Sequence, residues 1–152
     1  MISQKAKYAL RALVALAKEG DSLLIGEIAV RKNIPRKFLE LILLEMKRHG
    51  IVHSRRGKFG GYSLLMAPDK ITYGQVLRII DGPIAPLPCL SRIAYRRCAD
   101  CKTEETCEIR RVFARVAESA REVLDRTTIA DSLDSPLLGD EAEDTGHELA
   151  RL

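Results

Sequence analysis

Residues 25–49 constrain the fold more than any other stretch, because they predict a short helix, a tight turn and a longer helix. The longer helix, residues 35–49, opens on a proline, whose missing N–H costs nothing at the first helical position. Its apolar residues recur at the i, i+3, i+4, i+7 spacing of an amphipathic helix: Leu39, Ile42, Leu43 and Met46. Two helices joined in this way are typical of a helix-turn-helix, whose second helix is the recognition helix.

A basic hairpin follows this helix pair directly. Residues 51–56 and 62–66 are predicted as strands, and a glycine-rich turn separates them. Further helical patterns occupy residues 3–18 and 72–81 on either side of this region. A helix-turn-helix followed by such a hairpin is the pattern of a winged helix. We therefore expect a mainly α fold, with residues 1–82 forming a winged helix-turn-helix DNA-binding domain.

Charged side chains occupy the positions where such a domain would meet DNA. Arg36 and Lys37 fall in the first turn of the recognition helix, the end that normally meets base edges and phosphates. Glu40, one turn later, can accept a hydrogen bond from the amino group of cytosine. Three cations of the hairpin would lie near the DNA backbone or minor groove: Arg55, Arg56 and Lys58. For each residue the alternative is an ordinary solvated position.

The charge of the chain is unevenly distributed. Residues 1–80 contain 15 Lys and Arg against 6 Asp and Glu, whereas residues 131–152 contain one Arg against 7 acids. A basic front half favours a polyanionic partner such as double-stranded DNA, although a solvated surface remains the alternative. Residues 134–152 lack apolar periodicity, so they are predicted to be a disordered acidic tail.

All four cysteines fall within 19 residues: Cys89, Cys98, Cys101 and Cys107. Clustered thiols can hold a metal or an iron–sulfur cluster, form disulfides or act as redox groups. The sequence shows no signal-peptide pattern and no apolar run near the roughly 20 residues that span a bilayer. We therefore expect a cytoplasmic protein, and in a reducing compartment such cysteines more often bind metal or do redox work. Prolines open the segment, so residues 83–106 are expected to be a cysteine-rich loop.

A long amphipathic helix is predicted after the last cysteine, within residues 107–133. Its apolar stripe could pack on its own domain or pair with a second copy of the chain. The stripe consists of Ile109, Val112, Phe113, Val116, Ala117, Ala120, Val123 and Leu124.

Several segments together resemble one bacterial family, the Rrf-type winged-helix transcriptional regulators. They are AKYALRALVALA, IPRKFLELILLEMKRHGIV, RRGKFGGYSL, the cysteine loop and LDRTTIADSL, within residues 1–133. The resemblance implies a homodimer in which the terminal helix crosses the partner and each winged helix enters one half-site of a near-palindromic operator. It also matches Glu40 to a recognition-helix glutamate and Arg56 to a wing arginine, whereas Leu41 replaces a polar reader.

The resemblance bears on the cysteines as well, since family members include an iron–sulfur cluster regulator and a nitric-oxide sensor. Cys89, Cys101 and Cys107 match cluster ligands of the family, and Cys98 is an additional thiol in a longer loop. Two cations occupy positions that supply the fourth ligand in relatives: Arg110 replaces a histidine and Lys7 an aspartate. The resemblance thus makes Cys98 the candidate fourth ligand.

These observations predict a DNA-binding transcriptional regulator, expected to act as a repressor, whose operator affinity depends on an iron–sulfur cluster in the cysteine loop. A structural zinc site or a thiol–disulfide switch in the same loop is the alternative. An enzyme using Cys98 and Cys101 as a thiol–disulfide motif is disfavoured, because that chemistry needs a βαβ setting that the sequence lacks. The three histidines suggest no triad or metal trio, so we expect no enzyme activity.

Overall fold

The structure is a computed structural model that describes residues 2–99 and 101–134. The predicted tail therefore lies outside the described residues, apart from its first residue. The helices and strands, in chain order, are α1 (Gln4–Glu19), α2 (Ile25–Lys32), α3 (Arg36–Arg48), β1 (Val52–Arg55), β2 (Gly61–Leu64), the 3-10 turn η1 (Pro68–Lys70), α4 (Tyr73–Ile80), the 3-10 turn η2 (Pro88–Leu90), α5 (Glu108–Arg126) and α6 (Asp131–Asp134).

The first helix forms one wall of the core. Ser3 caps α1 by accepting a hydrogen bond from the Ala6 amide at 3.0 Å. The helix ends at Gly20, whose φ of 71° places it in the left-handed region that glycine adopts readily. Small residues and leucines fill its buried face, so α1 packs closely against α2, α3 and α4: Ala6, Ala9, Leu10, Ala12, Leu13, Ala15 and Leu16.

The predicted helix-turn-helix is present. Asn33 ends α2 in the left-handed conformation, with φ 50°, and its amide reaches back to the carbonyls of Ala29 and Val30. The recognition helix starts one residue later than expected, because Pro35 has an extended ψ of 125° and serves as the N-cap of α3. The four apolar residues predicted to face inward on α3 are fully buried: Leu39, Ile42, Leu43 and Met46.

The wing, defined here as residues 52–64, pairs β1 with β2 in an antiparallel register from Val52↔Leu64 to Arg55↔Gly61. It is fastened to the chain before α2 by two backbone hydrogen bonds between Leu23 and Tyr62, of 2.9 and 2.8 Å. Gly61 permits this contact, because its φ is 133° and a Cβ there would collide with the Leu23 carbonyl. The wing is therefore held against the helix-turn-helix by main-chain bonds.

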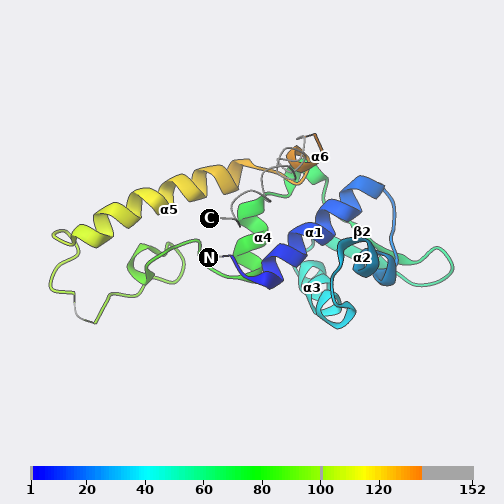
Figure 1. Ribbon diagram of the computed structural model, residues 1–152, viewed down its shortest axis with the longest axis horizontal. Helices are drawn as coiled ribbons and strands as arrows, with labels where there is room; N and C mark the ends of the chain where they lie inside the picture. The colour runs from blue at the N-terminus through cyan, green and yellow to red at the C-terminus, as the bar shows by residue number, and fades with distance from the viewer. Residues whose placement is uncertain (1, 100, 135–152) are drawn as a thin grey trace, which may run out of the picture.

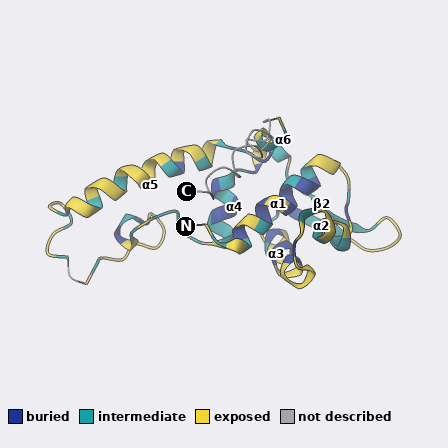
Figure 2. Cartoon of the chain, in the orientation of Figure 1, coloured by how far each residue is buried: buried dark blue, intermediate teal, exposed yellow. Residues whose placement is uncertain are grey.

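The chain leaves the winged helix after α4, passes through the cysteine loop (residues 83–106) and returns along α5 (Figure 1). Only the second half of α5 approaches the body, where it packs on α4, while its first half extends away and is largely exposed (Figure 2). After α5 the chain re-enters the core: the Ile129 side chain is fully buried, and its amide donates to the Ile71 carbonyl at 2.8 Å.

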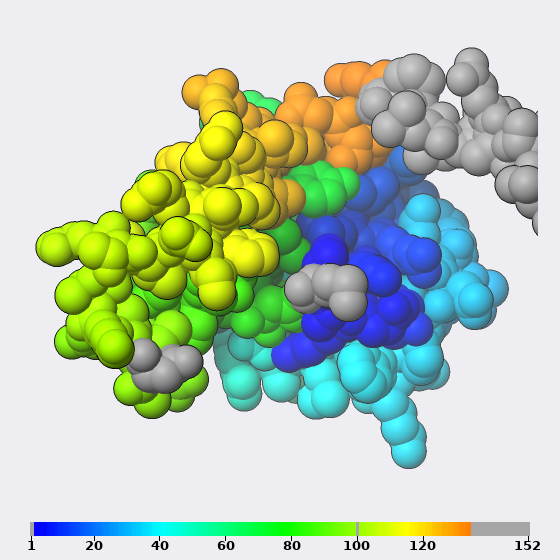
Figure 3. Space-filling model, turned by 60° about the vertical axis from the view of Figure 1, so that its left-hand side comes forward, coloured from blue at the N-terminus to red at the C-terminus, as the bar shows by residue number. Residues whose placement is uncertain are grey.

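Beyond Ile84, which packs against the core, the cysteine loop lies beside α5. Figure 3 shows its green side chains gathered against the yellow helix, to one side of the blue and cyan domain. The expected fold class, a mainly α winged helix-turn-helix with a long C-terminal helix, is confirmed. The predicted loop contains one short regular element, η2, because Pro88 favours the first position of a helical turn.

Candidate nucleic-acid interface and cysteine pocket

The three charged residues predicted on the recognition helix are all exposed. Arg36 and Lys37 occupy the first turn of α3, and Glu40 follows one turn later. The Arg36 Nε lies 3.4 Å from the Glu40 Oε1, an i,i+4 ion pair that orients both side chains along the outer surface. The carboxylate predicted to meet a base thus has a cation beside it.

The three predicted wing cations are also exposed, but they form a separate group from those on α3. Arg55 is the last residue of β1, and Arg56 and Lys58 lie in the turn between the strands. Phe59 is 86% exposed at the same turn, and the Lys58 Nζ lies 5.9 Å from the centre of its ring. The wing therefore presents cations and one aromatic ring to the solvent.

The four cysteines occupy different local structures. Cys89 lies in η2 and is buried. Cys98 and Cys101 flank a turn in which the Cys101 amide donates to the Cys98 carbonyl at 3.3 Å. Cys107 is the N-cap of α5, and its Sγ accepts a hydrogen bond from the Arg110 amide at 3.4 Å. The Cys107 thiol therefore caps the N-terminus of α5.

All four cysteines nevertheless line one cavity of about 380 Å³, together with two cations, Lys102 and Arg110. Within the described ranges, no three His, Cys, Asp or Glu residues lie close enough together to hold a metal ion. The four cysteines grouped from the sequence therefore line one pocket. Their sulfur atoms are not arranged as the ligands of a metal ion. Lys7, the other cation at a family ligand position, is an exposed residue of α1 outside this pocket.

Arg121 makes a connection that the sequence did not predict. Although charged, it is only 9% exposed, and its guanidinium joins α5 to Ile84, shortly after α4, and to Leu90, the last residue of η2. Its Nε donates to the Ile84 carbonyl at 3.1 Å and its Nη2 to the Leu90 carbonyl at 2.6 Å. Its position four residues after Ala117 and three before Leu124 was the available signal, because this spacing places it on the inward face of α5.

Glu104 forms a second connection between the loop and α5. Its carboxylate accepts a hydrogen bond from the Tyr95 hydroxyl, which raises the pKa of Tyr95. The same carboxylate lies 3.4 Å from the Arg110 Nε, close enough for an ion pair but without hydrogen-bond geometry. Arg121 and Glu104 together connect the cysteine loop to two different turns of α5.

Comparison with known proteins assigns this architecture to a family. The sequence profile of the Rrf2 family, described as an iron-dependent transcriptional regulator, matches residues 2–135. The rrf2-like HTH-type transcriptional regulator of Rhodobacter capsulatus is 51% identical over 138 residues, covering 88% of this chain and 92% of that protein. The chain belongs to the Rrf2 family. The HTH-type transcriptional regulator CymR of Bacillus subtilis is 35% identical over 133 residues, 86% of this chain and 87% of the relative.

Solved structures of Rrf2-type proteins have the same architecture. The structure of CymR, the global cysteine regulator of B. subtilis, matches with a TM-score of 0.72 and 31% identity, covering 87% of this chain and 95% of that one. IscR of T. potens matches with a TM-score of 0.68 and 27% identity, covering 88% and 85%. This Rrf2 protein is thus an HTH-type transcriptional regulator, which confirms the expectation that it is not an enzyme. Among its described helices, none has the length and apolarity to span a membrane.

Proposed function

We propose that this chain is a homodimeric repressor whose affinity for a near-palindromic operator is set by the state of its cysteine loop. One observation carries the proposal: Arg121 ties the loop that contains the cysteine pocket to α5, the helix with an exposed apolar face. A change of structure in the loop would therefore reach the helix that is available for pairing two winged helices.

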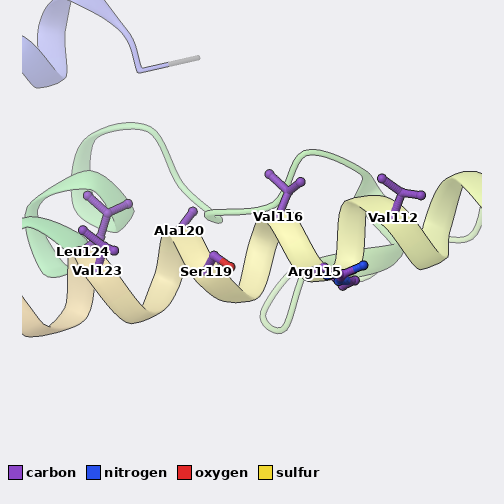
Figure 4. A pocket seen from close by; sticks show the side chains of 7 residues that line it. All are labelled: Val112, Arg115, Val116, Ser119, Ala120, Val123 and Leu124. Carbon is purple, nitrogen blue, oxygen red and sulfur yellow. The ribbon is translucent and has the colours of Figure 1, made fainter.

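The dimer is supported by the apolar face of α5, defined here as Val112, Val116, Ala120 and Val123. These side chains border an open hollow of about 670 Å³ (Figure 4). Val116 is 52% exposed and Val112 61%, although both are apolar residues of a well-formed helix. Exposed apolar side chains in a continuous stripe favour contact with another apolar surface. A second α5 offers a surface of matching length and composition.

Contact with DNA is proposed through two groups of residues in each protomer. Arg36, Lys37 and Glu40 would enter the major groove at the start of the recognition helix. The wing cations Arg55, Arg56 and Lys58 would meet the adjacent backbone or minor groove. The exposure of all six side chains supports this assignment. A two-fold dimer would present two such surfaces to the two half-sites of one operator.

The cysteine pocket is suited to an iron–sulfur cluster in its donor set, because three thiols of the cysteine loop and the Cys107 thiol at the start of α5 line a single cavity. Cys89, Cys101 and Cys107 are the proposed ligands, with Cys98 as the fourth. A bound cluster would supply a redox-sensitive link between these thiolates. Since their sulfur atoms do not form a closed set here, the loop would have to contract around the cluster. A regulatory ligand must favour one conformation of the protein over another, and contraction of the loop would provide such a second conformation.

A thiol–disulfide switch is the second candidate, and the turn between Cys98 and Cys101 favours it. In this turn the Cys101 amide donates a hydrogen bond to the Cys98 carbonyl at 3.3 Å, so the backbones of the two cysteines lie close together. A pair of nearby thiols needs no third ligand to change state. A structural zinc ion is the remaining alternative for the same four residues. All three versions assume a protein that works in the reducing cytoplasm.

The experiment is purification without air, followed by metal and sulfide analysis and by DNA-binding measurements on each form. Iron and sulfide, with an operator affinity that changes when they are removed, would support the cluster. Metal-free protein whose affinity changes between reduced and oxidised thiols would support the disulfide switch. Zinc with unchanged affinity on oxidation would support a structural ion. Equal affinity of all forms for a selected operator would refute control by the loop.

A further inference from the structure

The solvent-facing side of α3 carries two exposed leucines, which neither the core nor the ion pair between Arg36 and Glu40 explains. Leu41 is 62% exposed and Leu44 is 43% exposed. They follow Lys37 at i+4 and i+7, and Arg48 completes the series at i+11, so all four lie along one side of the helix. We call this series the outer row. It lies opposite the buried residues of α3: Leu39, Ile42, Leu43 and Met46.

The charges of the outer row indicate which partner covers it. Lys37 and Arg48 stand at its two ends and both are exposed, so the apolar centre is bounded by cations. A polyanion would satisfy the ends. The two leucines at the centre of the row would then meet a part of the polyanion that is less polar than the charged groups at its border. Duplex DNA fits this pattern, because phosphates border a groove whose floor is formed by base edges.

The floor of the major groove offers one apolar group, the C5 methyl of thymine. A leucine placed over a guanine or cytosine edge would cover hydrogen-bonding atoms without pairing them, which is unfavourable. A leucine over a thymine methyl instead removes two apolar surfaces from water. The outer row would therefore select thymine both by attraction and by the penalty at other bases.

We infer that Leu41 and Leu44 are specificity-determining residues that read thymine methyl groups in the major groove. This inference rests on the proposed contact of α3 with operator DNA, and it adds readers that act without hydrogen bonds. Glu40 precedes Leu41 in the same helix turn, so a cytosine contact and a thymine contact would fall on neighbouring base pairs. The cations at the ends of the row would hold the helix in register through phosphates.

The test begins with selection of a high-affinity duplex from a random-sequence pool by the wild-type protein. Each thymine of the selected duplex is then replaced singly by deoxyuridine, which removes the methyl group and keeps the base pair. Burial of one methyl group predicts about a fourfold loss of affinity at the contacted thymines. In the variants Leu41→Ala and Leu44→Ala, one of these deoxyuridine effects should disappear, because its partner side chain is gone.

The matched control is Leu65→Ala. Leu65 is 61% exposed, as Leu41 is, but it follows β2 and lies outside the outer row. The control should retain every deoxyuridine effect. Unchanged affinity of wild type for all deoxyuridine duplexes would overturn the inference and leave DNA binding intact. The same holds if the effects persist in both leucine variants, or if these variants change only the oligomeric state. Failure to select any duplex would overturn the proposed function as well.

Discussion

Replacing Arg121 with methionine should loosen the cysteine loop without unfolding the winged helix. The guanidinium donates to the carbonyls of Ile84 and Leu90 at 3.1 and 2.6 Å. A hydrogen bond from a charged donor contributes about 1.5–3 kcal/mol. Both acceptors belong to half-buried residues that regain water once the donor is lost, so we take the lower figure for each bond. Arg121→Met should therefore favour opening of the loop by about 3 kcal/mol.

Native-state hydrogen exchange can measure this opening. The amides of Leu90, Ser91 and Arg96 donate to carbonyls of residues 87 and 88, so they report on the closed loop. A change of about 3 kcal/mol corresponds to roughly a hundredfold faster exchange at these amides. The Ile129 amide, which donates to Ile71 within the core, should keep its rate.

Arg126→Met is the matched control for the Arg121 variant. It removes an arginine from the same helix, but one that is exposed and that pairs with Glu122 at 3.0 Å. An exposed i,i+4 pair contributes about 0.5 kcal/mol or less, so the loop amides should exchange as in wild type. Unchanged exchange in the Arg121 variant would refute the reasoning. It would mean that the cost of dehydrating the guanidinium cancels its hydrogen bonds to the two loop carbonyls.

Four further predictions concern the dimer, the DNA and the stability of the fold. Val116→Glu should abolish the dimer in sedimentation experiments, and a dimer that tolerates it would point to another interface. Arg56→Ala should weaken binding to a selected operator by about 1–3 kcal/mol if it contacts a base, and unchanged affinity and salt dependence would remove it from the interface. A chain that ends at Asp134 should keep the melting temperature and DNA affinity of the full chain, and loss of folding would refute this. The Arg78 guanidinium lowers the pKa of Asp125, so Asp125→Asn should lower the melting temperature at neutral pH, and the difference should vanish as the pH falls below the lowered pKa.

The helices and the wing were predictable because their apolar residues repeat at helix and strand periods. The turn at Asn33 and the end of α1 at Gly20 could be predicted because asparagine and glycine favour a left-handed backbone conformation. The start of α3 was misplaced by one residue because Pro35 suits both the N-cap and the first helical position. The sequence did not predict that Ile129 returns to the core, since one isoleucine after a long helix carries no periodic signal.

The candidate site was predictable in its residue types but not in its connections. The cysteines could be grouped because they are close in sequence, and they do line one cavity. The spacing of Arg121 from Ala117 and Leu124 indicated an inward position, but its partners could not be predicted, because the carbonyls of Ile84 and Leu90 are distant from it in sequence. The outward position of Leu41 was implied by the period of α3, but its exposure could be recognised only once the buried face was fixed.

The backbone bonds between Leu23 and Tyr62 limit how this regulator can respond to a signal. Because Gly61 allows the wing to hydrogen-bond with the chain ahead of α2, main-chain bonds tie the wing to the helix-turn-helix that contains the recognition helix. In the proposed dimer, each protomer would then present its recognition helix and wing at a constant spacing, so that it contacts the same stretch of a half-site whatever the state of the cysteine loop. On the proposed function, a signal at the cysteines would therefore act on how the two winged helices of the dimer are placed relative to each other.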